Sequence, residues 1–178
     1  MTEGQANGGA LKLRAEDAED LRVIAACLQD ALISLSDVRF EANDHRFVLV
    51  ANRFRWENCN ETSDMPVQAV EDIAIPEPVD PALAACASYE RVNCGICFEN
   101  VEQVRRRGFD PRDRGRILEL LTMDVETGAQ GSGSAVILVF AGGAAIRLEG
   151  RNITCKVGDI GDPWPTQWRP YHPADQTA

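Results

Sequence analysis

The chain has 178 residues, of which 44% are hydrophobic and 26% are charged. This length fits one domain, and this composition is that of an ordinary globular protein. The formal net charge of −10 argues against general binding to nucleic acid or to an anionic membrane. Nothing is long and apolar enough for membrane insertion. The first ten residues lack the features of a signal peptide, so we predict a cytoplasmic protein with reduced cysteines.

The chain divides into three parts by composition. Residues 1–10 are polar and rich in glycine, and we predict that they are disordered. Residues 11–161 are predicted to form a single α+β domain. Within it, residues 58–88 hold several prolines and acids without a usable period, which indicates a loop insertion. Residues 162–178 form a tail rich in proline and tryptophan, and regular secondary structure is not expected from Asp159 onward.

One amphipathic helix is predicted near the N-terminus, after a short strand around Leu11 and Leu13. Asp17 is placed to cap it, and the acids that follow suit the positive end of the helix dipole. The apolar positions recur at helical spacing and end near Ser34, and they are Leu21, Ile24, Ala25, Leu28 and Leu32. This stripe must be buried against a sheet, because one helix cannot cover it alone.

Most of the remaining chain reads as strands. Alternating or β-prone segments occur at residues 38–42, 46–56, 89–107, 117–126, 134–140, 145–149 and 153–157. Consecutive strands joined by short turns favour antiparallel pairing. The sequence therefore predicts a curled antiparallel sheet, or a partly open barrel of about 7–8 strands, with one N-terminal amphipathic helix.

The hairpin at residues 134–149 organises this prediction. Gly142-Gly143 lies between two apolar runs and is typical of a two-residue type I′ turn. Such a turn would pair Val139 with Ile146. Alternation would then place four residues on one face, namely Ile137, Val139, Ile146 and Leu148. The first strand is apolar on both faces, so we expect it inside the sheet and not at an edge.

Cys94-x-x-Cys97 is the most conspicuous motif. Residues i and i+3 of a strand point to opposite faces, which argues against a redox pair. Four thiolates could bind zinc if Cys59 and Cys86 joined Cys94 and Cys97, but their spacing matches no common structural site. Buried or incidental thiols are therefore favoured, with a metal site as the weaker alternative, and no cofactor is predicted.

Arginines form the one basic cluster of the chain, between residues 105 and 116. A solvated turn neutralised by nearby acids is the favoured interpretation. Binding of a small anion or nucleotide is the first alternative. Nucleic acid is disfavoured, since only Phe109 could stack on a base.

Several local sequences together resemble an uncharacterised bacterial family, a domain of unknown function common in alphaproteobacteria. They are LRVIAACLQDAL of the helix, NRFRWE at 52–57, Tyr89-Glu90-Arg91, RRRG at 105–108, LVFAGGAAIRLE of the hairpin, Gly161-x-Pro163-Trp164 and Arg169-Pro170-x-His172. The similarity covers most of residues 11–172. It departs in residues 58–88 and at the CGIC sequence. The resemblance implies a cytoplasmic single-domain protein, and it implies no activity.

No catalytic motif is recognisable around His45 or His172. The favoured hypothesis is a small non-enzymatic module that binds a protein partner or serves as an accessory subunit. Its candidate surface comprises Arg53, Trp56, Arg105, Arg107, Trp164, Arg169 and His172. The alternative is a small-molecule binding protein or enzyme that holds an anionic or phosphorylated metabolite with these arginines and uses His172 as acid or base. Converging arginines in a deep pocket would favour the enzyme, whereas an exposed aromatic patch would favour the binding module.

Overall fold

The computed structural model describes residues 9–58, 89–127 and 134–170. Within these ranges no helix is both long and apolar enough to cross a membrane. The elements in chain order are β1 (Lys12–Ala15), α1 (Ala18–Cys27), β2 (Leu32–Glu41), η1 (Ala42–Asp44), β3 (Arg46–Phe54), η2 (Trp56–Asn58), β4 (Tyr89–Arg107), β5 (Ile117–Thr127), β6 (Ser134–Phe140), η5 (Ala141–Gly143) and β7 (Ala145–Thr166).

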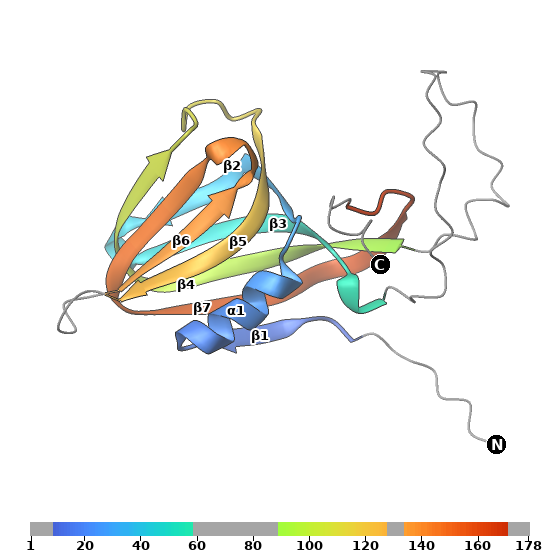
Figure 1. Cartoon of the computed structure of the whole chain (residues 1–178), viewed down its shortest axis with the longest axis horizontal. Coiled ribbons are helices and arrows are strands. Elements are labelled where there is room, and N and C mark those ends of the chain that lie inside the picture. The colour runs from blue at the N-terminus through green and yellow to red at the C-terminus, as the bar shows by residue number, and fades with distance from the viewer. Residues whose placement is uncertain (1–8, 59–88, 128–133, 171–178) are drawn as a thin grey trace, which may run out of the picture.

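The seven strands form one antiparallel sheet in the order β1-β7-β4-β3-β2-β5-β6. β6 also pairs with β7, so the sheet curls until its two sides meet (Figure 1). The first part of β7 pairs with β6, and its later part pairs with β1 along the same edge. This arrangement confirms the prediction of a curled antiparallel sheet with one N-terminal helix.

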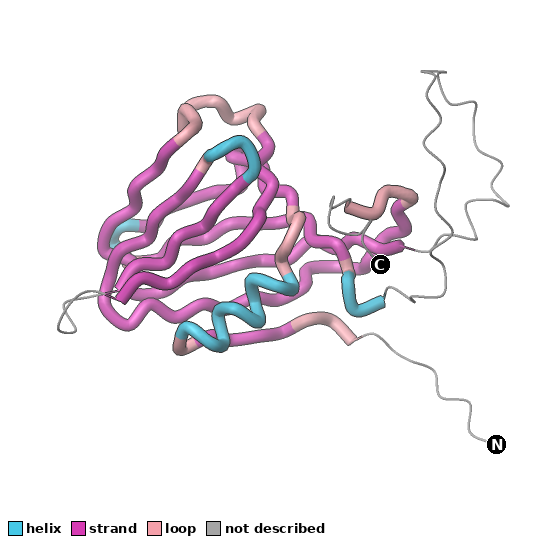
Figure 2. Tube along the Cα trace, in the orientation of Figure 1, coloured by secondary structure: helices cyan, strands magenta, loops and turns pink. Residues whose placement is uncertain are grey.

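β4 and β7 are long strands of 19 and 22 residues that pair along most of their length. Both bend where their pairing is irregular, between Glu99 and Gln103. Asn100 and Asn152 adopt positive φ there. A side chain on Gly150 would collide with the backbone oxygen of Asn100, so only glycine fits at this corner. The bend lets one pair of strands belong to both layers of the curled sheet (Figure 2).

The helix α1 begins as predicted but ends earlier. The Asp17 carboxylate accepts hydrogen bonds from the backbone N–H groups of Glu19 and Asp20, both at 2.9 Å. The helix ends at Cys27, because the chain turns at Asp30, whose φ is +60°, and residues 30 and 31 bond to Leu120 of β5. Leu32 therefore belongs to β2 and is exposed. Hydrogen bonding to the sheet overrides the helical period here.

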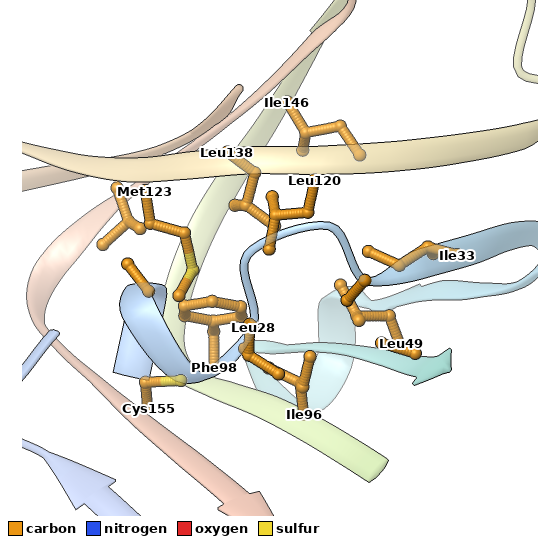
Figure 3. Packing of buried hydrophobic residues seen from close by; sticks show 14 of the residues in the cluster. Leu28, Ile33, Leu49, Ile96, Phe98, Leu120, Met123, Leu138, Ile146 and Cys155 are labelled. Carbon is orange, nitrogen blue, oxygen red and sulfur yellow. The ribbon is translucent and has the colours of Figure 1, made fainter. Parts of the chain in front are cut away.

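The core lies inside the curled sheet, beneath α1. Figure 3 shows Phe98 of β4 among the side chains of Leu28, which directly follows α1, and of residues from other strands, among them Met123, Leu138 and Cys155. All of these are buried. Burying an apolar side chain of this size contributes roughly 1.5–3 kcal/mol relative to leaving it exposed, so the interior is the main source of stability.

The hairpin at 134–149 is present, but its predicted register is wrong by one residue. Val139 pairs with Ala145 and Leu138 pairs with Ile146. The connection is longer than two residues, because Phe140 N–H bonds to the Ala144 carbonyl across η5. The slip exchanges the faces of the first strand, so Leu138 is buried and Ile137 is only half-buried. β6 is nevertheless paired on both sides, as its apolar composition predicts.

The prediction that the chain lacks regular structure from Asp159 onward is wrong for Asp159–Thr166. These residues continue β7 along β4 as far as Thr166, which pairs with Tyr89. Pro163 and Pro165 are accommodated because β1 begins at Lys12, opposite Gly158, which leaves the later part of that edge of β7 without a neighbouring strand among the described residues. A proline facing an open edge removes no ladder hydrogen bond.

Candidate functional site

The predicted surface residues fall into two groups at opposite ends of β4. Trp56 and Trp164 lie near Tyr89, where β4 begins, while Arg105 and Arg107 lie where it ends. Arg169 is exposed just beyond β7. His172 lies outside the described residues. The single surface proposed from the sequence is therefore divided between two separate places.

Arg53 is fully buried, so its side chain is not part of any surface. It extends the inward-facing row of β3 beyond Phe47, Leu49 and Ala51. Its Nε and Nη2 donate to the two carboxylate oxygens of Asp159, each at 2.8 Å. Its Nη1 and Nη2 donate to Glu57 at 3.1 and 2.8 Å. Two bidentate contacts fix this guanidinium as a structural element.

Asp159 connects β7 to β3 and to the residue before β1. It extends the inward row of Cys155 and Val157 on β7, and its carboxylate also accepts the Leu11 backbone N–H at 2.8 Å. Burial acts to raise the pKa of Asp159, but hydrogen bonds from Arg53 and Leu11 outweigh it, so the net pKa lies below the ordinary value. The pKa of Glu57 is lowered in the same way, against a desolvation effect, chiefly by Arg53. Both groups are therefore carboxylates at neutral pH.

Next to Arg53 along β3 begins a cluster that we call the aromatic end. It is formed by Phe54, Trp56, Tyr89, Arg91 and Trp164. Phe54 is fully buried, with the rings of Trp56 and Tyr89 centred 4.6 and 5.6 Å away. The Arg91 guanidinium lies 5.8 Å from the centre of the Phe54 ring, and Trp164 of β7 pairs with Arg91 of β4. Every member except Phe54 is partly exposed.

Hydrogen bonds fix the residues of the aromatic end and their neighbours in the chain. Trp56 donates its indole N–H to the Gln29 carbonyl at 3.2 Å. Glu90, next to Tyr89, accepts from Arg55 and from Asn58, both at 2.7 Å. Arg91 donates to the backbone and side-chain oxygens of Asn52. Burial lowers the pKa of Arg91. Among the described residues no carboxylate lies within ion-pair distance of it.

At the other end of β4 the outer face of the sheet carries a second candidate, the arginine groove. Residues of neighbouring strands line up in rows across this face. Arg105 lies opposite Arg147, which lies opposite Ile137, and Arg107 lies opposite Ala145, which lies opposite Val139. Since Ala145 has only a methyl group between longer neighbours, the face is hollowed there. The groove has a volume of about 400 Å³.

The groove is lined by Arg105, Arg106, Arg107 and Arg147, with Glu126, Ile137 and Ala145. Arg147 donates to Glu126 at 2.6 Å and to Glu149 at 2.8 Å, and Arg105 lies 3.3 Å from Glu149. Arg106 and Arg107 make no ion pair with any described residue. The groove thus contains more guanidinium than carboxylate charge in a protein that is acidic overall.

Gly108 fixes the end of β4 beside this groove. Its φ is +82°, and a Cβ there would lie 2.8 Å from the Ala144 Cα. Only glycine permits this approach of the β4 end to the turn before β7. The contact holds Arg107 next to Ala145, where the hollow lies.

The two cysteines of the motif lie on opposite faces of β4, as the assignment of these residues to a strand predicts. Cys94 is buried, and Cys97 is half-exposed on the outer face. Desolvation raises the pKa of the Cys94 thiol to about 12, so it is a neutral core residue. Within the described ranges no group of three or more metal-ligating side chains occurs. Cys59 and Cys86 lie outside those ranges, so the four-cysteine alternative stays a prediction.

Several residues of these sites do not appear in the sequence-based surface, among them Arg91, Arg147 and Asp159. The alternation of residues along a strand predicts that Arg53 and Asp159 both point inward, because each lies an even number of positions from buried residues of its own strand. Arg147 has the opposite parity to the buried Ile146 and Leu148, which predicts an outward side chain. Its position beside Arg105 depends on strand pairing, and no local pattern reveals it.

Comparison with known proteins gives a family but no activity. No curated protein and no solved structure matches the chain. A family model described as protein of unknown function, DUF2948, matches residues 11–172. This match covers most of the chain and confirms the resemblance to a domain of unknown function. The chain is therefore a member of the DUF2948 family.

Proposed function

We propose that the protein is a non-enzymatic binding module, an accessory subunit that docks onto a partner protein through the aromatic end. The observation that carries this proposal is the clustering of Trp56, Tyr89 and Arg91 around the buried Phe54, with Trp164 opposite Arg91 on the neighbouring strand. Tryptophan, tyrosine and arginine are the residues most enriched where truncation weakens protein interfaces most.

Rigidity supports this role. Trp56 is hydrogen bonded to Gln29, and the acidic neighbours of the aromatic side chains are held by Arg53 and Arg55. A surface whose side chains are already ordered loses little conformational entropy when a partner binds. The buried arginine pairs therefore favour binding although they do not touch the partner.

The chemistry of the end also defines the partner. The aromatic rings suit an apolar side chain, and Arg91 is a partly desolvated guanidinium whose hydrogen-bond acceptors among the described residues are the oxygens of Asn52. A carboxylate from the partner would complete its hydrogen bonding. The partner segment is thus an apolar residue adjacent to an aspartate or glutamate.

A photo-crosslinking experiment tests this proposal. A photoreactive phenylalanine analogue at Trp164 should capture one partner in the native cell, whereas the same analogue at the exposed Ile117 of β5 should not. With the purified partner, Trp164→Ala and Arg91→Ala should each weaken affinity about tenfold or more, and Arg39→Ala, on the exposed part of β2, should leave it unchanged. Equal affinity of all these variants would refute docking at the aromatic end.

A further inference from the structure

The arginine groove has a composition that the docking proposal does not use. It lies at the far end of β4 from Trp164, on the outer face of the sheet. We propose that this groove is a binding site for the phosphoryl group of a small phosphate ester, with the phosphate above Ala145 between Arg105, Arg107 and Arg147.

The pairing of the strands creates this position. Arg105 and Arg107 are two residues apart on β4, so their side chains leave the same face of the strand. Arg147 lies opposite Arg105 on β7, and Ala145 lies opposite Arg107. Three guanidiniums therefore surround the one short side chain of the row. Guanidinium groups bind the oxygens of phosphate in a planar, two-pronged geometry.

The number of guanidiniums favours a phosphate ester over a carboxylate. Arg105, Arg107 and Arg147 share the face of the groove, whereas Arg106 lies between the first two on β4 and opposite the buried Ile146, so its side chain leaves the other face. The ionic contacts of these three arginines are with the two carboxylates of Glu126 and Glu149, which leaves an excess of positive charge among the described residues. A phosphate ester has three strong acceptor oxygens and a carboxylate has two, so the ester can contact all three guanidiniums.

The floor of the groove favours an ester over the free ion. Ile137 and Ala145 supply apolar surface beside the guanidiniums. An apolar group attached to the phosphate could lie on Ile137 while the phosphate contacts the arginines. The volume of about 400 Å³ lies within the range of pockets that hold small molecules, about 300–1,000 Å³.

The test uses phenyl phosphate, phenyl sulfate and inorganic phosphate as probes in titration calorimetry of the full chain. Phenyl phosphate should bind saturably and more tightly than inorganic phosphate, and inorganic phosphate should compete with it. Because a phosphate ester gains its second charge at about pH 6, its affinity should rise between pH 5 and pH 8. The affinity of phenyl sulfate, which keeps one charge, should be lower and independent of pH.

Two variants and one control locate the site. Ala145→Leu fills the hollow without changing charge, and Arg107→Gln removes one guanidinium. Each should weaken phenyl phosphate binding about tenfold, as expected for a lost charge-assisted contact. Arg112→Gln removes an exposed arginine of the same cluster outside the groove and should change affinity less than about twofold. Thermal denaturation verifies that each variant is folded.

Several results would overturn the proposal. Equal weakening of phenyl phosphate binding by Arg112→Gln and Arg107→Gln would indicate general attraction to the arginine cluster. Unchanged binding in folded Ala145→Leu would exclude the hollow above Ala145 as the binding site. Tighter binding of inorganic phosphate than of phenyl phosphate would show that the apolar floor does not contribute to binding of the ester. A single-stranded oligonucleotide that binds far more tightly than phenyl phosphate would assign the groove to nucleic acid instead.

Discussion

Arg53 and Asp159 show how two charged residues become part of a core. Each continues the inward row of its strand past the last apolar residue, and each meets its counterpart across the sheet at 2.8 Å. A buried pair of this kind is stable because every lone pair and N–H that it removes from water finds a partner. In the part of the chain that the structure describes, no buried side-chain N or O atom is left without a hydrogen bond.

Replacing Asp159 with asparagine should destabilise the protein by about 3 kcal/mol, because it removes the charge opposite a buried guanidinium. Glu57→Gln should cost less, since the Glu57 side chain is 42% exposed and its contact with Arg53 is screened by solvent. Urea denaturation of the two variants measures the difference. A larger loss for Glu57→Gln would contradict the assignment of Asp159 as the main partner.

The pair of Arg53 and Asp159 also makes the free energy of unfolding depend on pH. The pKa of Asp159 in the folded protein is lower than its ordinary value of 3.8. Its contribution to stability is therefore fully present above the ordinary pKa and is lost as pH falls through the folded pKa. The free energy of unfolding should decline below about pH 4 in the natural protein, and less steeply in Asp159→Asn.

At the scale of elements, the β6–β7 hairpin has a register that its local sequence did not predict. The structure places Leu138 and Ile146 together on the core face, whereas the two-residue turn predicted from Gly142-Gly143 would place Ile137 there. Leu138→Ala should therefore cost roughly 3 kcal/mol through the lost burial and the cavity that remains. Ile137→Ala, on the groove side, should cost less than about 1 kcal/mol. Chemical denaturation of both variants tests the register, and the reverse order of costs would restore the two-residue turn.

This hairpin also explains what the sequence could and could not reveal. The existence of the strands followed from alternation, and the start of α1 followed from the capping role of Asp17, because both depend on neighbours in the chain. The register depended on how many residues the turn uses, and two glycines allow more than one answer. The end of α1 depended on hydrogen bonds between residues 30 and 31 and Leu120, which are distant in sequence.

The candidate sites follow the same division. Trp56 and Trp164 could be proposed because tryptophan and arginine are typical of interfaces. Their separation from Arg105 and Arg107 could not, since it depends on β4 and β7 pairing over nearly their whole length. Arg53 was assigned to a surface on its residue type alone, although its parity with Phe47, Leu49 and Ala51 indicated an inward position.

For the whole molecule, the two long strands connect two surfaces of different chemistry. The aromatic end lies where β4 begins and β7 ends, and the arginine groove lies where β4 ends and β7 begins (Figure 1). The corner near Gly150 lies between them. We propose that one surface binds a protein partner and the other a small anion, so a mutation in either should leave the other intact.

The most direct test of this account measures both affinities in both variants. Trp164→Ala should weaken binding to the crosslinked partner about tenfold and leave binding to phenyl phosphate unchanged, while Ala145→Leu should have the opposite effects. Each variant that remains folded and loses only one affinity supports two independent surfaces. If either folded variant lost both affinities together, the division of the molecule into an aromatic end and an arginine groove would be contradicted.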